Sequence, residues 1–230
     1  ILGFSLASLF NFPLEIAAGI ILIGSSPSGL ASNVMAYLAK ANIALSVTLT
    51  AVATLLAPIM TPFLMKTLAG SFVPIDFLAM MTSIFKIVIV PVLLGLIFNY
   101  FFHGKAKWLD KAMPIISMAG IGFIIMIITA AGRDDLLSIG LLLILAAIIH
   151  NLLGYVFGYW GCRIFGMSEQ DCRTIAFEVG MQNGGLATGI ALEMGKISTV
   201  GLAPAIFGPW MNISGSSLAT WWRDKEPKKK

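Results

Sequence analysis

Long runs without a charged residue dominate this sequence. Five of them cover residues 16–39, 41–65, 112–132, 136–162 and 197–222. A helix needs roughly 20 apolar residues to cross the hydrocarbon core of a bilayer, and each run is at least that long. The alternating ten-residue segments that are typical of membrane barrels do not occur in the sequence. The pattern therefore predicts an all-α, polytopic membrane protein.

Two apolar stretches contain a polar, glycine-rich interruption that predicts a broken helix. In the first stretch, residues 14–24 and 30–39 are separated by Ser25-Ser-Pro-Ser-Gly29. Pro27 has no amide proton to donate and Gly29 is conformationally permissive, so a helix is expected to stop there.

The second broken helix is predicted at residues 169–194, with a break at 180–184. Its start resembles a capping box, because Asp171 follows Ser168 by three residues. The other helices are expected at residues 1–10, 42–67, 74–102, 109–131, 135–164 and 197–221.

The two breaks are similar in sequence and lie 156 positions apart. Ser28-Gly-Leu-Ala-Ser-Asn33 precedes Lys40, and Gly184-Gly-Leu-Ala-Thr-Gly189 precedes Lys196 at the same spacing. The step from the first broken helix to the second is five membrane segments, so the two copies cross the membrane in opposite senses. Paired broken helices in corresponding halves are typical of secondary transporters. The chain is therefore expected to have an inverted-repeat transporter fold.

Composition and charge agree with this class. Hydrophobic residues make up 58% of the chain and charged residues 11%, whereas soluble domains carry about 25% charged residues. The net charge of +4 comes largely from the tail at 223–230, next to a predicted helix, where basic residues usually set topology. We therefore expect no nucleic-acid partner. Cys162 and Cys172 are expected to be free thiols.

The distribution of Lys and Arg predicts a cytoplasmic C-terminus, because basic residues accumulate on the cytoplasmic side. Under that orientation the 11 basic residues on the inside are Lys40, Lys105, Lys107, Lys111, Arg163, Arg173, Arg223, Lys225 and Lys228 to Lys230, and the 3 on the outside are Lys66, Arg133 and Lys196. Lys86 falls within a predicted helix. The opposite orientation would reverse this ratio.

Glu178 is the most informative single residue. It lies about 14 Å along the half-helix that begins near Glu169, which places a carboxylate near the middle of the bilayer. Ionisable residues at that depth are costly and usually functional. Oxygen-rich neighbours favour a hard cation, while a protonated glutamate hydrogen-bonded within the bundle is the structural alternative.

Hydroxyl side chains near the first break could complete such a site. Ser32 and Asn33 follow the break, and Ser46 and Thr50 lie four residues apart on one face of the next helix. Hydroxyls on apolar helices also bond back to their own preceding turn, so that reading stays open for each of them.

These residues resemble the bile acid:sodium symporter family, in particular its bacterial homologues. The matching residues are Ser32-Asn33-Val-Met35, Ser46 with Thr50, and Phe177-Glu-Val-Gly-Met-Gln-Asn183 followed by Gly184-Gly185. The resemblance implies two sodium sites. One is similar to a site of Ser32, Asn33, Ser46, Thr50 and Glu178. The other is similar to a site of Glu178, Val179, Met181 and Gln182 with a glutamine from a helix that we expect upstream of Ile1.

The resemblance also implies a core domain, in which the two broken helices cross, and a panel domain. Residues 1–73 and 132–222 would form the core, residues 74–131 part of the panel, and 223–230 a cytoplasmic basic tail. An amphipathic organic anion, such as a bile acid or a smaller carboxylate, would bind between core and panel with Asn183 and Asn212 as hydrogen-bonding groups. Two helices and most of a third are then expected ahead of this chain.

The sequence thus predicts a sodium-coupled symporter in a bacterial inner membrane, with sodium, an organic anion and the lipid bilayer as its partners and no protein partner implied. A sodium-independent or proton-coupled carrier of the same fold is one alternative. A channel or a non-transporting membrane scaffold is another. An enzyme is not expected, because Glu178 and His150 lack an evident activated nucleophile and no HExxH pair occurs.

Overall fold

The computed structural model describes residues 1–102 and 107–225, and helices form nearly all of this part of the chain. The helices are α1 (Leu2–Leu9), α2 (Leu14–Ser25), α3 (Leu30–Leu38), α4 (Ile43–Leu68), α5 (Phe77–Ile84), the π-helical turn η1 (Phe85–Ile89), α6 (Val90–Phe102), α7 (Lys107–Ala131), α8 (Arg133–Ile164), α9 (Glu169–Gly180), α10 (Gly184–Glu193) and α11 (Leu202–Arg223). Most of the predicted basic tail, residues 226–230, lies outside the described residues.

Three helical stretches in the described part are long and apolar enough to cross a membrane: Ile43–Leu68, Phe77–Phe101 and Arg133–Ile164. The prediction of an all-α, polytopic membrane protein is confirmed. The predicted breaks are also present, because α2 and α3 are separate helices, as are α9 and α10. Ser168 caps α9 as expected, since its Oγ accepts a hydrogen bond from the Asp171 amide at 3.1 Å. Both cysteines are free.

Two helices differ from the sequence prediction, one in its start and one in its interior. The last helix begins at Leu202, five residues later than expected, and Pro204 lies in its first turn, where a missing amide proton costs nothing. The predicted helix at 74–102 contains the π-helical turn η1. Pro91 follows this turn closely and cannot donate to the carbonyl four residues earlier, which explains why the regular pattern is interrupted there.

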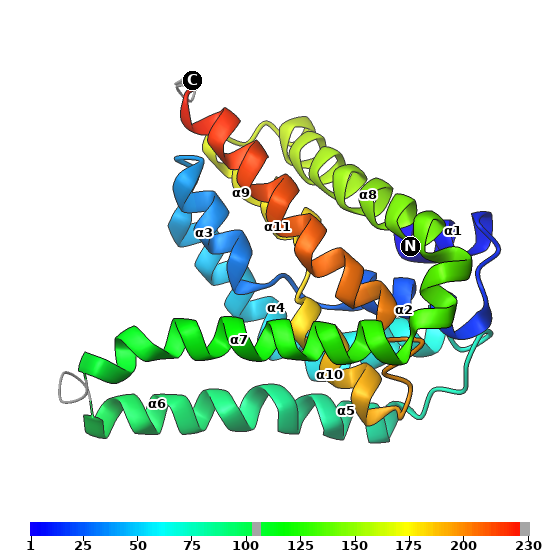
Figure 1. The fold of residues 1–230 in the computed structure, drawn as a ribbon. Coiled ribbons are helices and arrows are strands. Elements are labelled where there is room, and N and C mark those ends of the chain that lie inside the picture. Colours follow the sequence, from blue (N-terminus) through cyan, green and yellow to red (C-terminus); the bar gives the residue numbers. More distant parts are fainter. Residues whose placement is uncertain (103–106, 226–230) are drawn as a thin grey trace.

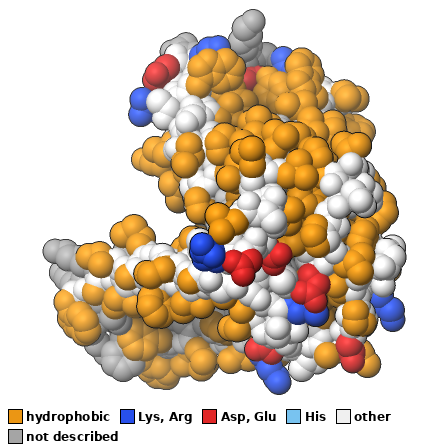
Figure 2. All heavy atoms as spheres, turned by 45° about the vertical axis from the view of Figure 1, so that its right-hand side comes forward, with side chains coloured by type: hydrophobic (Ala, Val, Ile, Leu, Met, Phe, Trp, Pro, Cys, Tyr) orange, Lys and Arg blue, Asp and Glu red, His pale blue; other side chains and the backbone are white. Residues whose placement is uncertain are grey.

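The helices form a body and an arm, and the arm consists of α6 and α7. In Figure 1, α3, α9, α11 and α8 run side by side in the body, while α6 and α7 extend together along its lower edge. Figure 2 shows the arm projecting from the body, with a hollow between them whose visible walls are largely hydrophobic. Side chains along α6 are exposed, as on helices that face lipid.

Small residues allow the body helices to approach closely. A Cβ added to Gly158 of α8 would lie 2.6 Å from the Ile175 carbonyl oxygen of α9. A Cβ on Gly19 of α2 would lie 2.4 Å from the Val200 oxygen, just before α11. Small residues at such contacts are typical of helix packing in membranes.

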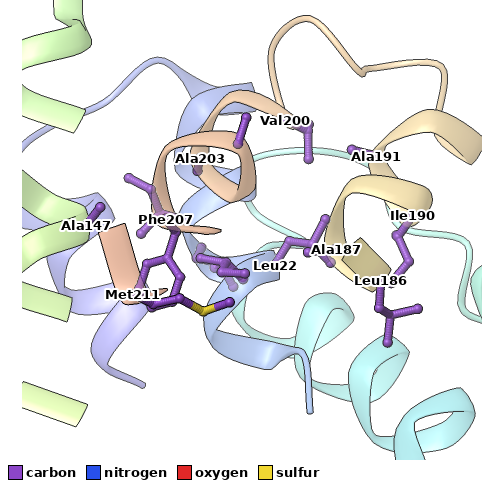
Figure 3. Close-up of a cluster of buried hydrophobic side chains, with 14 of the residues drawn as sticks. Leu22, Ala147, Leu186, Ala187, Ile190, Ala191, Val200, Ala203, Phe207 and Met211 are labelled. Atoms are coloured by element: carbon purple, nitrogen blue, oxygen red, sulfur yellow. The ribbon is translucent and has the colours of Figure 1, made fainter. Parts of the chain in front are cut away.

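A buried apolar cluster joins the two broken helices to α8 and α11. Leu22 of α2 lies between Phe207 of α11 and Ala187 of α10 in the view of Figure 3. All three side chains are fully or almost fully buried. This cluster fixes the broken helices against the long ones, so that their breaks meet in a defined position.

Candidate cation site

The two breaks lie against each other and pair like short antiparallel strands. Ser28 and Gln182 form an isolated β-bridge. The Gly29 amide donates to the Met181 carbonyl at 3.3 Å, and the Asn183 amide donates to the Pro27 carbonyl at 2.7 Å. Backbone groups that each helix loses at its break are therefore satisfied by the other break, as burial in a membrane requires.

Side chains from neighbouring long helices satisfy the carbonyl ends of the first half-helices. Thr61 of α4 donates to the carbonyl of Ser25 at 2.9 Å, where α2 ends. Asn151 of α8, which is fully buried, donates to the carbonyl of Gly180 at 2.8 Å, where α9 ends. Helix ends leave such carbonyls without intrahelical partners. At both breaks, therefore, a side chain from a long helix caps the last carbonyl of the preceding half-helix.

The Glu178 carboxylate lies beside this crossing and is surrounded by hydroxyls. Ser32 and Ser46 each approach its Oε1 at 2.7 Å. Ser28 approaches its Oε2 at 2.6 Å and Thr50 approaches the same oxygen at 2.9 Å. All five residues are at least nine-tenths buried, so the cluster is shielded from bulk water.

Asn33 completes the cluster from α3. Its Oδ1 lies 2.7 Å from Ser46 Oγ and 3.1 Å from Thr50 Oγ1. Ser46 and Thr50 point from one face of α4, as their spacing predicted. The structure therefore brings together five residues expected from the sequence: Ser32, Asn33, Ser46, Thr50 and Glu178.

This cluster has more short oxygen–oxygen contacts than hydroxyl protons. Ser46 and Thr50 each have a single proton but face both Asn33 and Glu178. Ser32 likewise faces both Glu178 and the Gly29 carbonyl. A hydroxyl donates only one hydrogen bond, so some of these close oxygen pairs have no proton between them and repel each other. A cation among these oxygens would remove that repulsion.

The charge of the cluster fits a monovalent ion. It holds one carboxylate, and its other oxygens are neutral. Among the described residues, no group of three or more His, Cys, Asp or Glu side chains converges. Divalent calcium sites usually draw on several carboxylates, and soft metals prefer sulfur. One negative charge with neutral hard oxygens is suited to an alkali cation.

The other residues expected to bind sodium have a different arrangement. Gln182 donates its side-chain amide to the carbonyl of Val179 at 2.8 Å, so two of the expected ligands bond to each other. The Met181 carbonyl accepts from Gly29, and its side chain is fully buried. Val179, Met181 and Gln182 follow Glu178 closely in the sequence. The hydroxyls that contact the Glu178 carboxylate, in contrast, all come from the first half of the sequence.

The two asparagines expected at the substrate site lie on different helices. Asn183 caps α10, and its Oδ1 accepts from the Leu186 amide at 3.0 Å. Asn212 is exposed on α11 and donates to the Gly208 carbonyl of its own helix at 3.0 Å. Asn183 therefore lies at the crossing, while Asn212 faces outward from the described part of the chain.

Three residues of the site were missed in the sequence analysis. Ser28 was read only as part of a break, although a hydroxyl in a break can contact a carboxylate on the opposite break. Asn151 and Thr61 are polar residues inside apolar helices, and a buried polar side chain there indicates a hydrogen-bond partner on a neighbouring segment. Which break each one serves depends on helix packing that the sequence pattern does not specify.

Polar ties hold the crossing at its two ends. At what we name the Arg173 end, buried Arg173 donates to the carbonyls of Ala39, Trp222 and Lys225, and Asn42 donates to Asp171 at 2.8 Å. These bonds join the ends of α3 and α11 to the start of α9.

At the opposite end, named the Lys196 end, Glu15 of α2 pairs with Lys196 and accepts from Thr199 at 2.5 Å. Glu15 and Asp171 are themselves 156 positions apart, as are Lys40 and Lys196. Each tie therefore joins the start of one broken helix to the segment that follows the other.

Comparison with known proteins shows that this chain is similar to sodium-dependent transporters. The model of the Sodium Bile acid symporter family matches residues 1–139. The "Uncharacterized sodium-dependent transporter YocS" of Bacillus subtilis is 41% identical over 230 residues, which is all of this chain and 71% of that protein. The "Probable sodium/metabolite cotransporter BASS1, chloroplastic" of Arabidopsis thaliana is 35% identical over 226 residues, 98% of this chain and 56% of that protein.

Proposed function

This chain belongs to the Sodium Bile acid symporter family, and from that premise we propose that it serves sodium-coupled import of an organic anion. The observation that carries the proposal is the Glu178 carboxylate among four hydroxyls and the Asn33 amide oxygen. Sodium would act as a co-substrate, which binds on one side of the membrane and leaves on the other.

In this proposal the first sodium ion binds among Ser32, Asn33, Ser46, Thr50 and Glu178. These residues come from α3, α4 and α9. Since α3 and α9 belong to different broken helices, one ion would hold both broken helices against α4. A carboxylate is costly inside a membrane unless a partner offsets its charge. Sodium supplies that charge and leaves the site neutral.

A second sodium ion is proposed to bind on the other side of Glu178, with Val179, Met181 and Gln182. Support comes from their position at the end of α9, where backbone carbonyls and the negative end of the helix dipole gather. The hydrogen bond from Gln182 Nε2 to the Val179 carbonyl would have to open to free that carbonyl for the ion. A glutamine from a further helix would complete this site.

The substrate is proposed to be an amphipathic organic anion, such as a bile acid or a smaller carboxylate. Both second half-helices, α3 and α10, begin at the crossing, and the positive ends of their dipoles favour negative charge. Asn183 lies at the start of α10 and would orient the anion. Asn212 would contribute from α11. The names of two plant relatives give a metabolite as the solute that they carry with sodium.

Transport would follow from movement of a core against a panel. Residues 1–73 and 132–222 hold both broken helices and are proposed as the core, and residues 74–131 as part of the panel. The opposite senses of the two repeats would give inward- and outward-facing forms of similar energy. Sodium would raise substrate affinity by fixing the crossing, and the substrate would raise sodium affinity by the same factor.

We assign the protein to a bacterial inner membrane with its C-terminus in the cytoplasm. The packing supports this orientation, because Lys40, Arg173, Arg223 and Lys225 belong to segments that meet at the Arg173 end. That end would be cytoplasmic by the positive-inside rule, and the Lys196 end would face outward.

Transport assays test the proposal directly. The protein is reconstituted into liposomes, and uptake of a labelled bile acid and of a labelled short-chain carboxylate is measured with an inward gradient of sodium, potassium or choline. Uptake of one of these anions is expected only with sodium. Equal uptake with all three cations would refute sodium coupling, and uptake driven by a pH gradient alone would favour the proton-coupled alternative.

A further inference from the structure

We propose that Ser28 is an additional ligand of the cation that binds at Glu178. This inference rests on the proposed function, because it assumes a cation at that carboxylate. Ser28 lies within the first break itself, whereas the four neutral residues expected from the sequence lie inside α3 and α4. It was not among the residues that the sequence analysis assigned to either site.

Distances place the Ser28 hydroxyl within the same oxygen cluster. Its Oγ lies 2.6 Å from Glu178 Oε2 and 3.5 Å from Thr50 Oγ1. Calcium, an ion about as large as sodium, takes oxygen ligands at roughly 2.3–2.6 Å, so two ligands of one such ion lie at most about 5 Å apart. One ion can therefore contact Ser28, Thr50 and Glu178 together.

The direction of the hydroxyl proton favours the same role. Ser28 has one acceptor within 3 Å, Oε2 of Glu178, so its proton points at the carboxylate. The other hydroxyls divide their protons between two acceptors. A hydroxyl that donates its only proton keeps both lone pairs for other contacts. Ser28 therefore presents a fixed, neutral oxygen without adding charge to the site.

The backbone of Ser28 makes it a link between the ion and the crossing. Its β-bridge to Gln182 and the adjacent bond from Gly29 to Met181 hold it against the second break. Its neighbour Gly29 is the residue from which α3 begins. An ion held by Ser28 would thus fix the point where both second half-helices start. Loss of this ligand is expected to weaken sodium binding and, through it, the effect of sodium on substrate affinity.

Sodium titration of thermal stability tests this role. The purified protein is titrated with NaCl, with choline chloride holding the ionic strength constant, and the sodium concentration at half-maximal stabilisation is measured. Ser28→Ala is expected to raise that midpoint about tenfold, as befits the loss of one bond to a charged group. Ser28→Cys keeps the shape but replaces oxygen with soft sulfur, and it is expected to shift the midpoint similarly. Ser28→Thr, which keeps the hydroxyl, is expected to restore it.

Ser26→Ala is the matched control. Ser26 lies in the same break and is equally buried, but its hydroxyl donates to the Leu22 carbonyl at 2.9 Å. It should leave the midpoint unchanged, even if it lowers the melting temperature.

The outcomes separate the two proposals. If the unmodified protein is stabilised equally by sodium and choline, sodium coupling and the role of Ser28 both fall. If sodium stabilises it specifically but Ser28→Ala keeps the same midpoint, only the role of Ser28 is refuted. A lower melting temperature with an unchanged midpoint would show that Ser28 is merely structural. If Ser28→Ala does not fold, the midpoints of the Cys and Thr variants decide.

Discussion

The two breaks have the same backbone arrangement but carry different chemistry. Each ends a half-helix whose last carbonyl is satisfied from a long helix, by Thr61 in one case and Asn151 in the other. The first break and the helices beside it supply neutral hydroxyl and amide oxygens. The second supplies the only carboxylate of the cluster, Glu178.

This division shows why neither half of the chain can form the site alone. The hydroxyls of α3 and α4 without Glu178 would be a neutral polar cluster, with little attraction for a cation. Glu178 without those hydroxyls would be a buried charge lacking hydrogen bonds, which is strongly unfavourable. The cluster exists only where the two broken helices cross, so occupancy of the proposed cation site would report on their relative position.

Removing the charge from the second break is expected to have the largest effect. Glu178→Gln keeps the shape and can still accept from the hydroxyls, but it removes the attraction for a cation. Sodium-specific thermal stabilisation should disappear, with affinity falling at least about 100-fold, which corresponds to roughly 2.7 kcal/mol.

Glu193→Gln, an exposed carboxylate at the end of α10, is the control for Glu178→Gln. It should titrate with sodium like the unmodified protein. Retention of sodium-specific stabilisation by Glu178→Gln would contradict the assignment of the carboxylate.

The close packing of α9 on α8 gives the next largest effect. A Cβ on Gly158 would meet backbone atoms of Ile175 and Ala176 at 2.6 and 2.8 Å, and backbone cannot move aside easily. Gly158→Ala should lower the free energy of unfolding by about 1–3 kcal/mol, the usual cost of overpacking. Thermal unfolding in detergent measures this.

Gly161→Ala, one turn further along α8, is its control, because a Cβ there meets nothing within 4 Å. Gly29→Ala extends the test to the first break. Its Cβ would lie 3.2 Å from the Gln182 carbonyl, so a smaller loss is expected. Equal losses at Gly158 and Gly29 would show that α9 packs on α8 no more tightly than the two breaks pack on each other.

Removing a neutral oxygen on the first-break side is expected to have a moderate effect. Thr50→Val is nearly isosteric and deletes the hydroxyl that approaches Glu178 Oε2 at 2.9 Å. The sodium midpoint should rise about tenfold, as expected for one lost bond to a charged group.

Thr48→Val on the same helix is the control for Thr50→Val. Its hydroxyl is exposed and bonds back to the Ala44 carbonyl at 2.8 Å, away from the cluster. If both variants shift the midpoint by the same amount, the effect comes from α4 as a whole and not from the ligand oxygen.

Much of the fold and half of the site followed from local signals in the sequence. Pro27 and Gly29 within apolar sequence predicted the first break, and the four-residue spacing of Ser46 and Thr50 predicted their shared face. Both depend only on backbone chemistry and helical period. The position of Glu178 close to the end of α9, beside the second break, was also predicted.

The remainder depends on contacts between distant segments. Ser28 reaches Glu178 only because the breaks pair, and Asn151 reaches Gly180 only because α8 and α9 pack through glycines. Pro204 indicates that α11 begins near residue 202, but residues 197–222 are uniformly hydrophobic, so the hydrophobic pattern predicted an earlier start. Sequence periodicity reflects local structure and does not predict which distant segments pack together.

The smallest effect is expected at the polar contacts that hold the two ends of the crossing. The contact at the Lys196 end is an ion pair, whereas one of the donors at the Arg173 end is a neutral amide. Lys196 and Glu15 form an ion pair whose side chains are 32% and 37% exposed, while Asn42 and Asp171 are joined by a hydrogen bond from a neutral amide. Exposed ion pairs contribute about 0–1 kcal/mol and weaken as salt screens them. Lys196→Met should therefore lower the melting temperature slightly at low choline chloride concentration and not at all at roughly 1 M, where the screening length is about 3 Å. Asn42→Ala should cost a similar amount at both concentrations. A salt-independent loss for Lys196→Met would mean that its packing, and not its charge, joins the start of α2 to the end of α10.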